Sequence, residues 1–176
     1  MKHSPQNRTQ AKPLISRRSA SIFDALNPSL TNLESLALQK AWRILEPKLR
    51  SLSTDILMDL YSEHYEIMEK FRDESGKLCN YELINYTTWL LRLYGTIINN
   101  KVDPIKTKKI LEPLIEKLKK YSMDVVCVKL QLEGIKHFIF AELRNALSPT
   151  SIEAFNKLHN TIIRYVHIKL NLHNIQ

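Results

Sequence analysis

The residue types that most often bind metals or activate nucleophiles are scattered along this chain. His159, His167 and His173 do not repeat at the four-residue spacing that places two imidazoles on one helix face, so they are weak evidence for zinc. Cys79 and Cys127 are not spaced as a metal pair. We expect each thiol to act as a small apolar side chain in a reducing compartment, and we predict no metal site.

His64 and His137 have simpler interpretations than ligand binding. His64 begins the short segment 64-HYEIMEKF-71, where we expect it to cap a helix or contact the surface. His137 lies in an apolar stretch and is predicted to be partly buried with a hydrogen-bond partner. The sequence shows no Ser/His/Asp or Cys/His set, no carboxylate pair suited to a pocket and no glycine-rich phosphate loop. We therefore predict that the protein is not an enzyme.

Composition favours a helical protein made of one domain and a tail. The chain has 176 residues, of which 44% are apolar and 25% charged, as in an ordinary globular domain. It contains only three glycines, too few for the tight turns of a β-rich fold. No apolar run reaches the roughly 18 residues of a membrane helix, and no secretory signal is apparent. We expect a soluble, cytoplasmic protein.

Half of the net charge of +8 lies in residues 1–30, where five basic residues face one acidic residue. Prolines and polar residues separate these charges, so we predict a disordered, solvated tail over 1–30. A basic tail can also bind acidic lipid or nucleic acid by charge alone, although no aromatic residues interleave with its basic ones. The charged residues are Lys2, Arg8, Lys12, Arg17, Arg18 and Asp24.

The predicted helices begin at Thr31, which forms a capping box with Glu34. Pro47 should end or kink the first helix, and 53-STD-55 is predicted to start the second. A short helix over 64–71 and a polar loop over 72–80 follow.

Long helices fill the rest of the chain. The apolar repeats predict helices over 81–99, after Pro104 and over 124–147, and a last helix with Ser148 at its cap and Pro149 at its first position. The predicted fold class is all-α, with about seven helices in a single domain over 31–172.

The segment 54-TDILMDLYSEHYEIMEKF-71 resembles a globin. In it, "HYEIMEKF" is similar to the globin pattern "HPExxxxF", and Phe71 matches the phenylalanine that packs on the haem ring. Without a gap, Trp42 matches the tryptophan common in the first globin helix, and Leu57 matches the residue that roofs the distal haem pocket. The resemblance extends over roughly residues 31–170 and implies a globin-like fold.

Two later segments continue the resemblance. The stretch 83-LINYTTWLLRLYG-95 is similar to the helix over the distal face of haem, with Tyr86 at the distal position, or Asn85 if the register shifts by one. Leu90 then matches a pocket-lining residue one turn later. The stretch 148-SPTSIEAFNKLHNTI-162 resembles the last globin helix, where Phe155 matches a common aromatic.

The chain departs from the globin pattern at the iron ligand. The stretch 110-ILEPLIEKLKKY-121 resembles the proximal helix, but the run that should end on histidine ends on Leu118. No histidine occurs between Tyr65 and Lys136, so a shift in register does not supply one. Leucine has no lone pair to give iron. The remaining candidate ligand is the Tyr86 phenolate, which would bind ferric haem from the distal side.

The resemblance implies haem as cofactor and the binding of oxygen or another gas as activity. Leu118 makes this chain atypical and opposes haem binding. The alternative is a haem-free globin-like module for protein interaction or for sensing an apolar ligand. The haem-pocket residues implied by the resemblance are Leu57, Phe71, Tyr86, Leu90 and Leu118.

Overall fold

The computed structural model describes residues 28–101 and 103–173, and most of this part of the chain is helical. Six of its helices have ten or more residues, and an isolated β-bridge between Arg72 and Leu78 closes the loop before α6. The expected all-α class is therefore confirmed for this part, whereas most of the predicted tail over 1–30 lies outside it. The elements are α2 (Asn32–Leu45), η1 (Glu46–Lys48), α3 (Leu49–Met58), α4 (Leu60–Glu63), α5 (Tyr65–Glu69), α6 (Asn80–Asn99), α7 (Pro104–Lys120), α8 (Val125–Leu143) and α9 (Pro149–His173).

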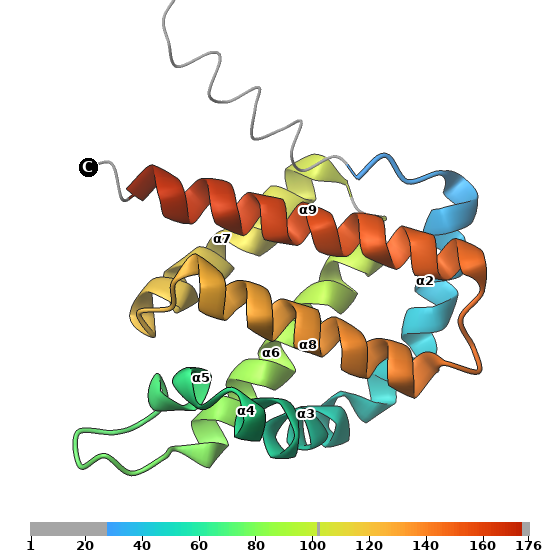
Figure 1. Cartoon of the computed structure of the whole chain (residues 1–176). Coiled ribbons are helices and arrows are strands. Elements are labelled where there is room, and N and C mark those ends of the chain that lie inside the picture. Colours follow the sequence, from blue (N-terminus) through green and yellow to red (C-terminus); the bar gives the residue numbers. More distant parts are fainter. Residues whose placement is uncertain (1–27, 102, 174–176) are drawn as a thin grey trace, which may run out of the picture.

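The long helices form two layers that share one core (Figure 1). Helices α8 and α9 lie side by side and run in opposite directions, with α6 and α7 behind them. The first helix, α2, packs mainly against the last, α9, while α3 packs mainly against α6. The short helices α4 and α5 cross the lower end of the molecule. No helix in residues 28–101 and 103–173 is both long and apolar enough to cross a membrane.

The closest approach between α2 and α6 depends on a glycine. Gly95 of α6 faces the indole of Trp42, which is 2% exposed. A Cβ atom built on Gly95 would lie 2.3 Å from Trp42 Nε1, far inside van der Waals contact. Only a residue without a side chain lets the backbone of α6 approach this large ring, so Gly95 sets the distance between the two helices.

Side-chain caps define where several helices begin. Thr31 accepts a hydrogen bond from the Glu34 backbone N–H, and Glu34 Oε2 accepts one from the Thr31 N–H at 2.7 Å, so the predicted capping box is confirmed. The predicted cap of α9 is also confirmed, because Ser148 Oγ accepts from the Ser151 N–H and Pro149 is the first helical residue. Glu34 additionally pairs with Lys157 of α9 at 2.6 Å.

The predicted start of the second helix was wrong. Helix α3 already begins at Leu49, and Ser53 and Thr54 lie inside it. Their hydroxyls donate to the carbonyls of Leu49 and Arg50 one turn earlier, at 2.6 and 3.2 Å. Serine and threonine can make this backward bond within a helix as well as cap one, so their presence alone did not locate the helix start.

Candidate functional site

The predicted site residues Phe71 and Tyr86 contact each other in the core. Phe71 follows α5 and Tyr86 lies on α6; each is 2% exposed, and their ring centroids are 5.2 Å apart. Tyr121, just after α7, completes the cluster, with its ring 4.5 Å from that of Phe71 and 5.3 Å from that of Tyr86. The space beside Phe71 is thus occupied by aromatic rings of the protein itself.

A chain of buried hydrogen bonds holds the Tyr86 hydroxyl. This hydroxyl donates to Gln131 Oε1 at 3.2 Å, and Gln131 Nε2 donates to the Tyr61 hydroxyl at 2.7 Å. The Tyr61 and Thr87 oxygens are 2.9 Å apart, and Thr87 Oγ1 donates to the Leu83 carbonyl at 2.9 Å. If the Tyr61 hydroxyl donates to Thr87 Oγ1, each of the three hydroxyls uses its single proton for one of these hydrogen bonds. The five residues therefore form a complete polar network that links α4, α6 and α8.

Burial makes the two tyrosines of this network poor acids. Desolvation, and then the neighbouring Tyr61 and Tyr121 hydroxyls, raise the pKa of Tyr86 well above its ordinary value. Desolvation likewise raises the pKa of Tyr61 to about 12, against the opposing effect of its hydrogen bonds. Both residues are neutral hydrogen-bond donors at physiological pH. A phenolate at position 86 would require the loss of the proton that bonds Gln131.

Leu118 occupies the interior face of α7, where the globin resemblance calls for an iron ligand. Its side chain has no exposed surface and belongs to the continuous apolar core, as do those of Leu111, Leu114 and Ile115 on the same helix. Leu57 and Leu90 are in that core as well, at 9% and 1% exposed. All the predicted pocket residues are therefore packed in one core, but only Phe71 and Tyr86 are joined by a ring contact.

Asn85, the alternative distal residue, points away from this cluster. It is half-buried, and its Oδ1 accepts a hydrogen bond from Arg50 Nη1 of α3 at 2.7 Å in an exposed setting. Of the two registers weighed for the distal position, only Tyr86 therefore places a side chain beside Phe71.

The histidines lie in different surroundings. His64 separates α4 from α5 at the surface, as predicted, with Nδ1 3.6 Å from Glu66. His137 is exposed, so the prediction of partial burial was wrong. His159, by contrast, has no exposed surface: its Nδ1 is 2.9 Å from the Tyr94 hydroxyl, and its Nε2 is 3.2 Å from Glu133 Oε1 without good hydrogen-bond geometry.

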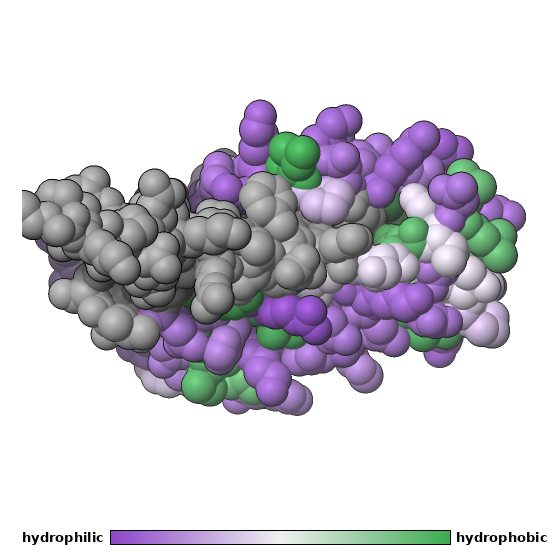
Figure 2. All heavy atoms as spheres, turned by 90° about the horizontal axis from the view of Figure 1, so that it is seen from above, coloured by the Kyte–Doolittle hydropathy of each residue, from purple (hydrophilic) through white to green (hydrophobic). Residues whose placement is uncertain are grey.

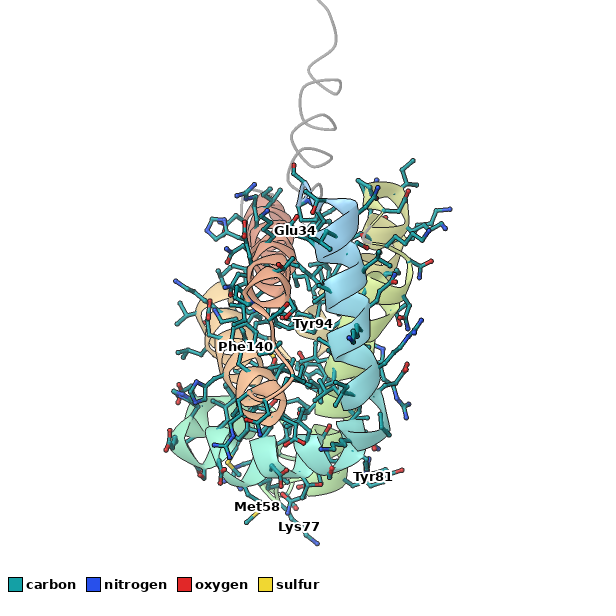
Figure 3. All side chains as sticks on the ribbon, turned by 90° about the vertical axis from the view of Figure 1, so that its right-hand side faces the viewer. Glu34, Met58, Lys77, Tyr81, Tyr94 and Phe140 are labelled. Atoms are coloured by element: carbon teal, nitrogen blue, oxygen red, sulfur yellow. The ribbon has the colours of Figure 1, made fainter. Side chains whose placement is uncertain are left out.

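This Tyr94–His159–Glu133 group was missed by sequence reasoning. Tyr94 precedes His159 by 65 positions, and it lies between the helices in Figure 3. Desolvation lowers the pKa of His159, against the opposing effect of Glu133, so the ring is neutral near pH 7. The available signal was the position of His159 in the α9 apolar repeat, next to Leu158 and three residues before Ile162.

No group of three or more His, Cys, Asp or Glu residues suited to a metal ion occurs within the described ranges. Cys127 is buried, and desolvation raises the pKa of its thiol, as does nearby Asp124, which leaves it protonated and weakly reactive. Cys79 is partly exposed and unpaired with Cys127. Among the described residues, no hydrogen bond joins either thiol to a histidine.

The structure thus defines an all-helical domain whose candidate site is a filled, hydrogen-bonded core. In comparisons with known proteins, no family model matches the sequence and no curated protein matches it.

Proposed function

We propose that this protein is a haem-free, globin-like module that acts by binding another protein. The observation that carries the proposal is that the protein's own side chains fill the region between α6 and α7. Tyr86 and Leu118 are buried there against the protein's own side chains, and the Tyr86 hydroxyl is already bonded to Gln131. We also propose that the protein catalyses no reaction.

The helix order and packing support the globin-like part of the proposal. The first helix packs on the last, α3 on α6, and α8 on α9, while Phe71 lies beside the helix that carries Tyr86. The resemblance implies that Phe71 and Tyr86 both belong to a haem pocket, and the contact between their rings agrees with that part of it.

Haem does not fit the residues found in that region. Insertion of a porphyrin would separate Phe71, Tyr86 and Tyr121, whose rings are in contact, and would break the hydrogen bond from Tyr86 to Gln131. Leu118 offers iron no electron pair, and the raised pKa of Tyr86 opposes phenolate formation. Apolar burial of the porphyrin would be the main remaining source of affinity.

Titration of the purified protein with hemin, followed by absorption, tests the proposal. We expect no stoichiometric Soret band, and the Tyr86→Phe variant should give the same spectrum as the parent. A stoichiometric band that Tyr86→Phe removes or shifts would contradict the haem-free proposal and support the second candidate, a haem protein that binds ferric iron through Tyr86. Phe71 beside Tyr86 is the observation that favours this second candidate.

The Leu118→His variant gives an independent test of whether the pocket persists. Because position 118 has no exposed surface and apolar neighbours, we expect the buried imidazole to lower the stability of the fold without giving a five-coordinate ferrous haem spectrum. A gain of that spectrum would show that α7 retains the proximal position and that the core opens for haem.

A further inference from the structure

The antiparallel helices α8 and α9 form a groove on one side of the molecule. The groove has a volume of about 330 Å³ and lies between the first half of α8 and the second half of α9. In Figure 1 these two halves lie next to each other across the front of the molecule. The lining residues are Val125, Val128, Lys129 and Leu132 of α8 and Asn160, Ile163, Arg164, Val166 and His167 of α9.

On each wall of the groove, the lining residues recur at the spacing of one helix face. On α8 the lining positions 125, 128, 129 and 132 follow the spacing i, i+3, i+4, i+7, and on α9 the positions 160, 163, 164 and 167 do the same. Each wall is therefore about two helical turns long, or roughly 10 Å. Two such stripes side by side form a groove of the kind in which an amphipathic helix buries its apolar face.

The floor of the groove is apolar and its rim is basic. Val128, Leu132 and Val166 are at most 2% exposed and form the floor, whereas Lys129 and Arg164 are exposed at the edges. Neither Lys129 nor Arg164 has a carboxylate partner in the part of the chain that the structure describes.

Nearby carboxylates do not offset this positive charge. After Glu153, the sequence of α9 contains no aspartate or glutamate. On α8, Glu133 pairs with Lys136, and Glu142 pairs with Lys48. Asp124 accepts the Cys127 N–H at the start of the helix. The groove therefore presents apolar surface flanked by Lys129 and Arg164, two cations that form no ion pair with a described residue.

We propose that this groove docks an amphipathic helix of another protein that carries acidic residues beside its apolar stripe. The proposal rests on the proposed function, because it names the surface and the partner of a protein-binding module. A second copy of this chain fits less well. A two-fold contact would bring Lys129 and Arg164 opposite the same residues of the other copy, and like charges that face each other at an interface are unfavourable.

Titration of the full-length protein with synthetic helical peptides tests the proposal. The probe is a labelled peptide of about 18 residues with leucine at i, i+3, i+4 and i+7 and glutamate at the flanking positions. A matched peptide carries lysine in place of every glutamate. We expect the acidic peptide to bind with an affinity that falls as salt rises, and the lysine peptide not to bind.

The Lys129→Glu/Arg164→Glu variant should weaken binding of the acidic peptide by about tenfold or more, since it exchanges two attractive charges for two repulsive ones. Lys119→Glu is the matched control, because Lys119 is an exposed lysine of α7 outside this groove, and it should leave the affinity nearly unchanged. Circular dichroism of all variants checks that the helical fold is intact.

Four results would overturn the proposal: no binding of the acidic peptide, equal binding of the lysine peptide, equal binding by the charge-reversed variant, or a dimer in sedimentation that this variant dissociates. Binding of phosphatidylserine vesicles through Lys129 and Arg164, without binding of the peptide, would also overturn it and assign the groove to a membrane. The hemin titration separately decides the haem-free function, so a failure of either idea is recognised on its own.

Discussion

Tyr61 and Tyr165 are two tyrosines without exposed surface whose hydroxyls have opposite surroundings. The Tyr61 hydroxyl accepts from Gln131 Nε2 and lies 2.9 Å from Thr87 Oγ1. The Tyr165 hydroxyl, also without exposed surface, has no hydrogen-bond partner in the described chain. Burial raises the pKa of both residues to about 12. The same deletion of a hydroxyl should therefore have different costs at the two positions.

We expect Tyr61→Phe to lower the free energy of unfolding by about 1–3 kcal/mol, because it leaves the buried Gln131 amide without an acceptor. Tyr165→Phe should be neutral or slightly stabilising, since it removes a buried polar group that has no partner. Urea denaturation of both variants measures the difference. Equal losses for the two variants would contradict the hydrogen-bond network.

His159 gives the fold a pH dependence whose sign follows from its surroundings. Desolvation lowers its pKa in the folded state below the value of about 6.5 in the unfolded chain, so the unfolded state binds the proton more readily. The free energy of unfolding should therefore have its full value above about pH 6.5 and should fall as the pH is lowered from there toward pH 5.

Thermal unfolding at a series of pH values measures this effect. The His159→Gln variant should lose most of the slope between about pH 6.5 and 5, above the range in which carboxylates titrate. His137→Gln is the matched control at an exposed histidine and should retain the slope. A parent protein whose stability does not change over this interval would show that the pKa of His159 is not lowered in the fold.

At the scale of the elements, Gly95 permits the close approach of α6 to α2. Gly95→Ala places a methyl group against the Trp42 indole, which is held in the core. The improved helix propensity of alanine offsets part of the clash, and we expect a net loss of about 1–2 kcal/mol of unfolding free energy. Thr96→Ala, at the exposed neighbouring position, should change stability by less than about 0.5 kcal/mol. Urea denaturation distinguishes these outcomes, and a stabilised Gly95→Ala variant would contradict the close contact.

Local signals in the sequence predicted the elements well where the physical cause was also local. Thr31 with Glu34, and Ser148 with Pro149, each satisfy the backbone of the helix that they begin, so a few neighbouring residues suffice to identify them. Ser53 misled the prediction of α3, because its hydroxyl can either cap a helix or bond one turn back inside it.

The candidate site was harder to predict, because its contacts join distant parts of the chain. The apolar repeats indicated that Tyr86 and Leu118 are interior residues, and the globin resemblance placed Phe71 in a pocket; all three are buried. They did not indicate that Gln131 would bond both Tyr86 and Tyr61, from 45 and 70 positions away. A buried glutamine partner depends on how α8 is placed against α4 and α6, which no short stretch of sequence specifies.

At the scale of the whole molecule, the described helices share one continuous core. Residues from α2 through α9 belong to the same buried apolar cluster. We expect a single cooperative unfolding transition. Tryptophan fluorescence, which reports Trp42 and Trp89 of α2 and α6, should give the same urea midpoint as the helical circular dichroism signal. Two separate midpoints would show that the core is divided into independent parts.

The pairing of Glu34 with Lys157 joins the cap of the first helix to the last helix, across 123 positions of sequence. Around it, α2 packs more extensively against α9 than against any other element, and α9 is synthesised after all the other described helices. During synthesis, α2 must therefore wait without its main packing partner until the described helices that precede α9 have been made. Contacts of such long sequence separation also slow folding in vitro, so this helical domain should fold more slowly than a bundle whose neighbours in space are neighbours in sequence.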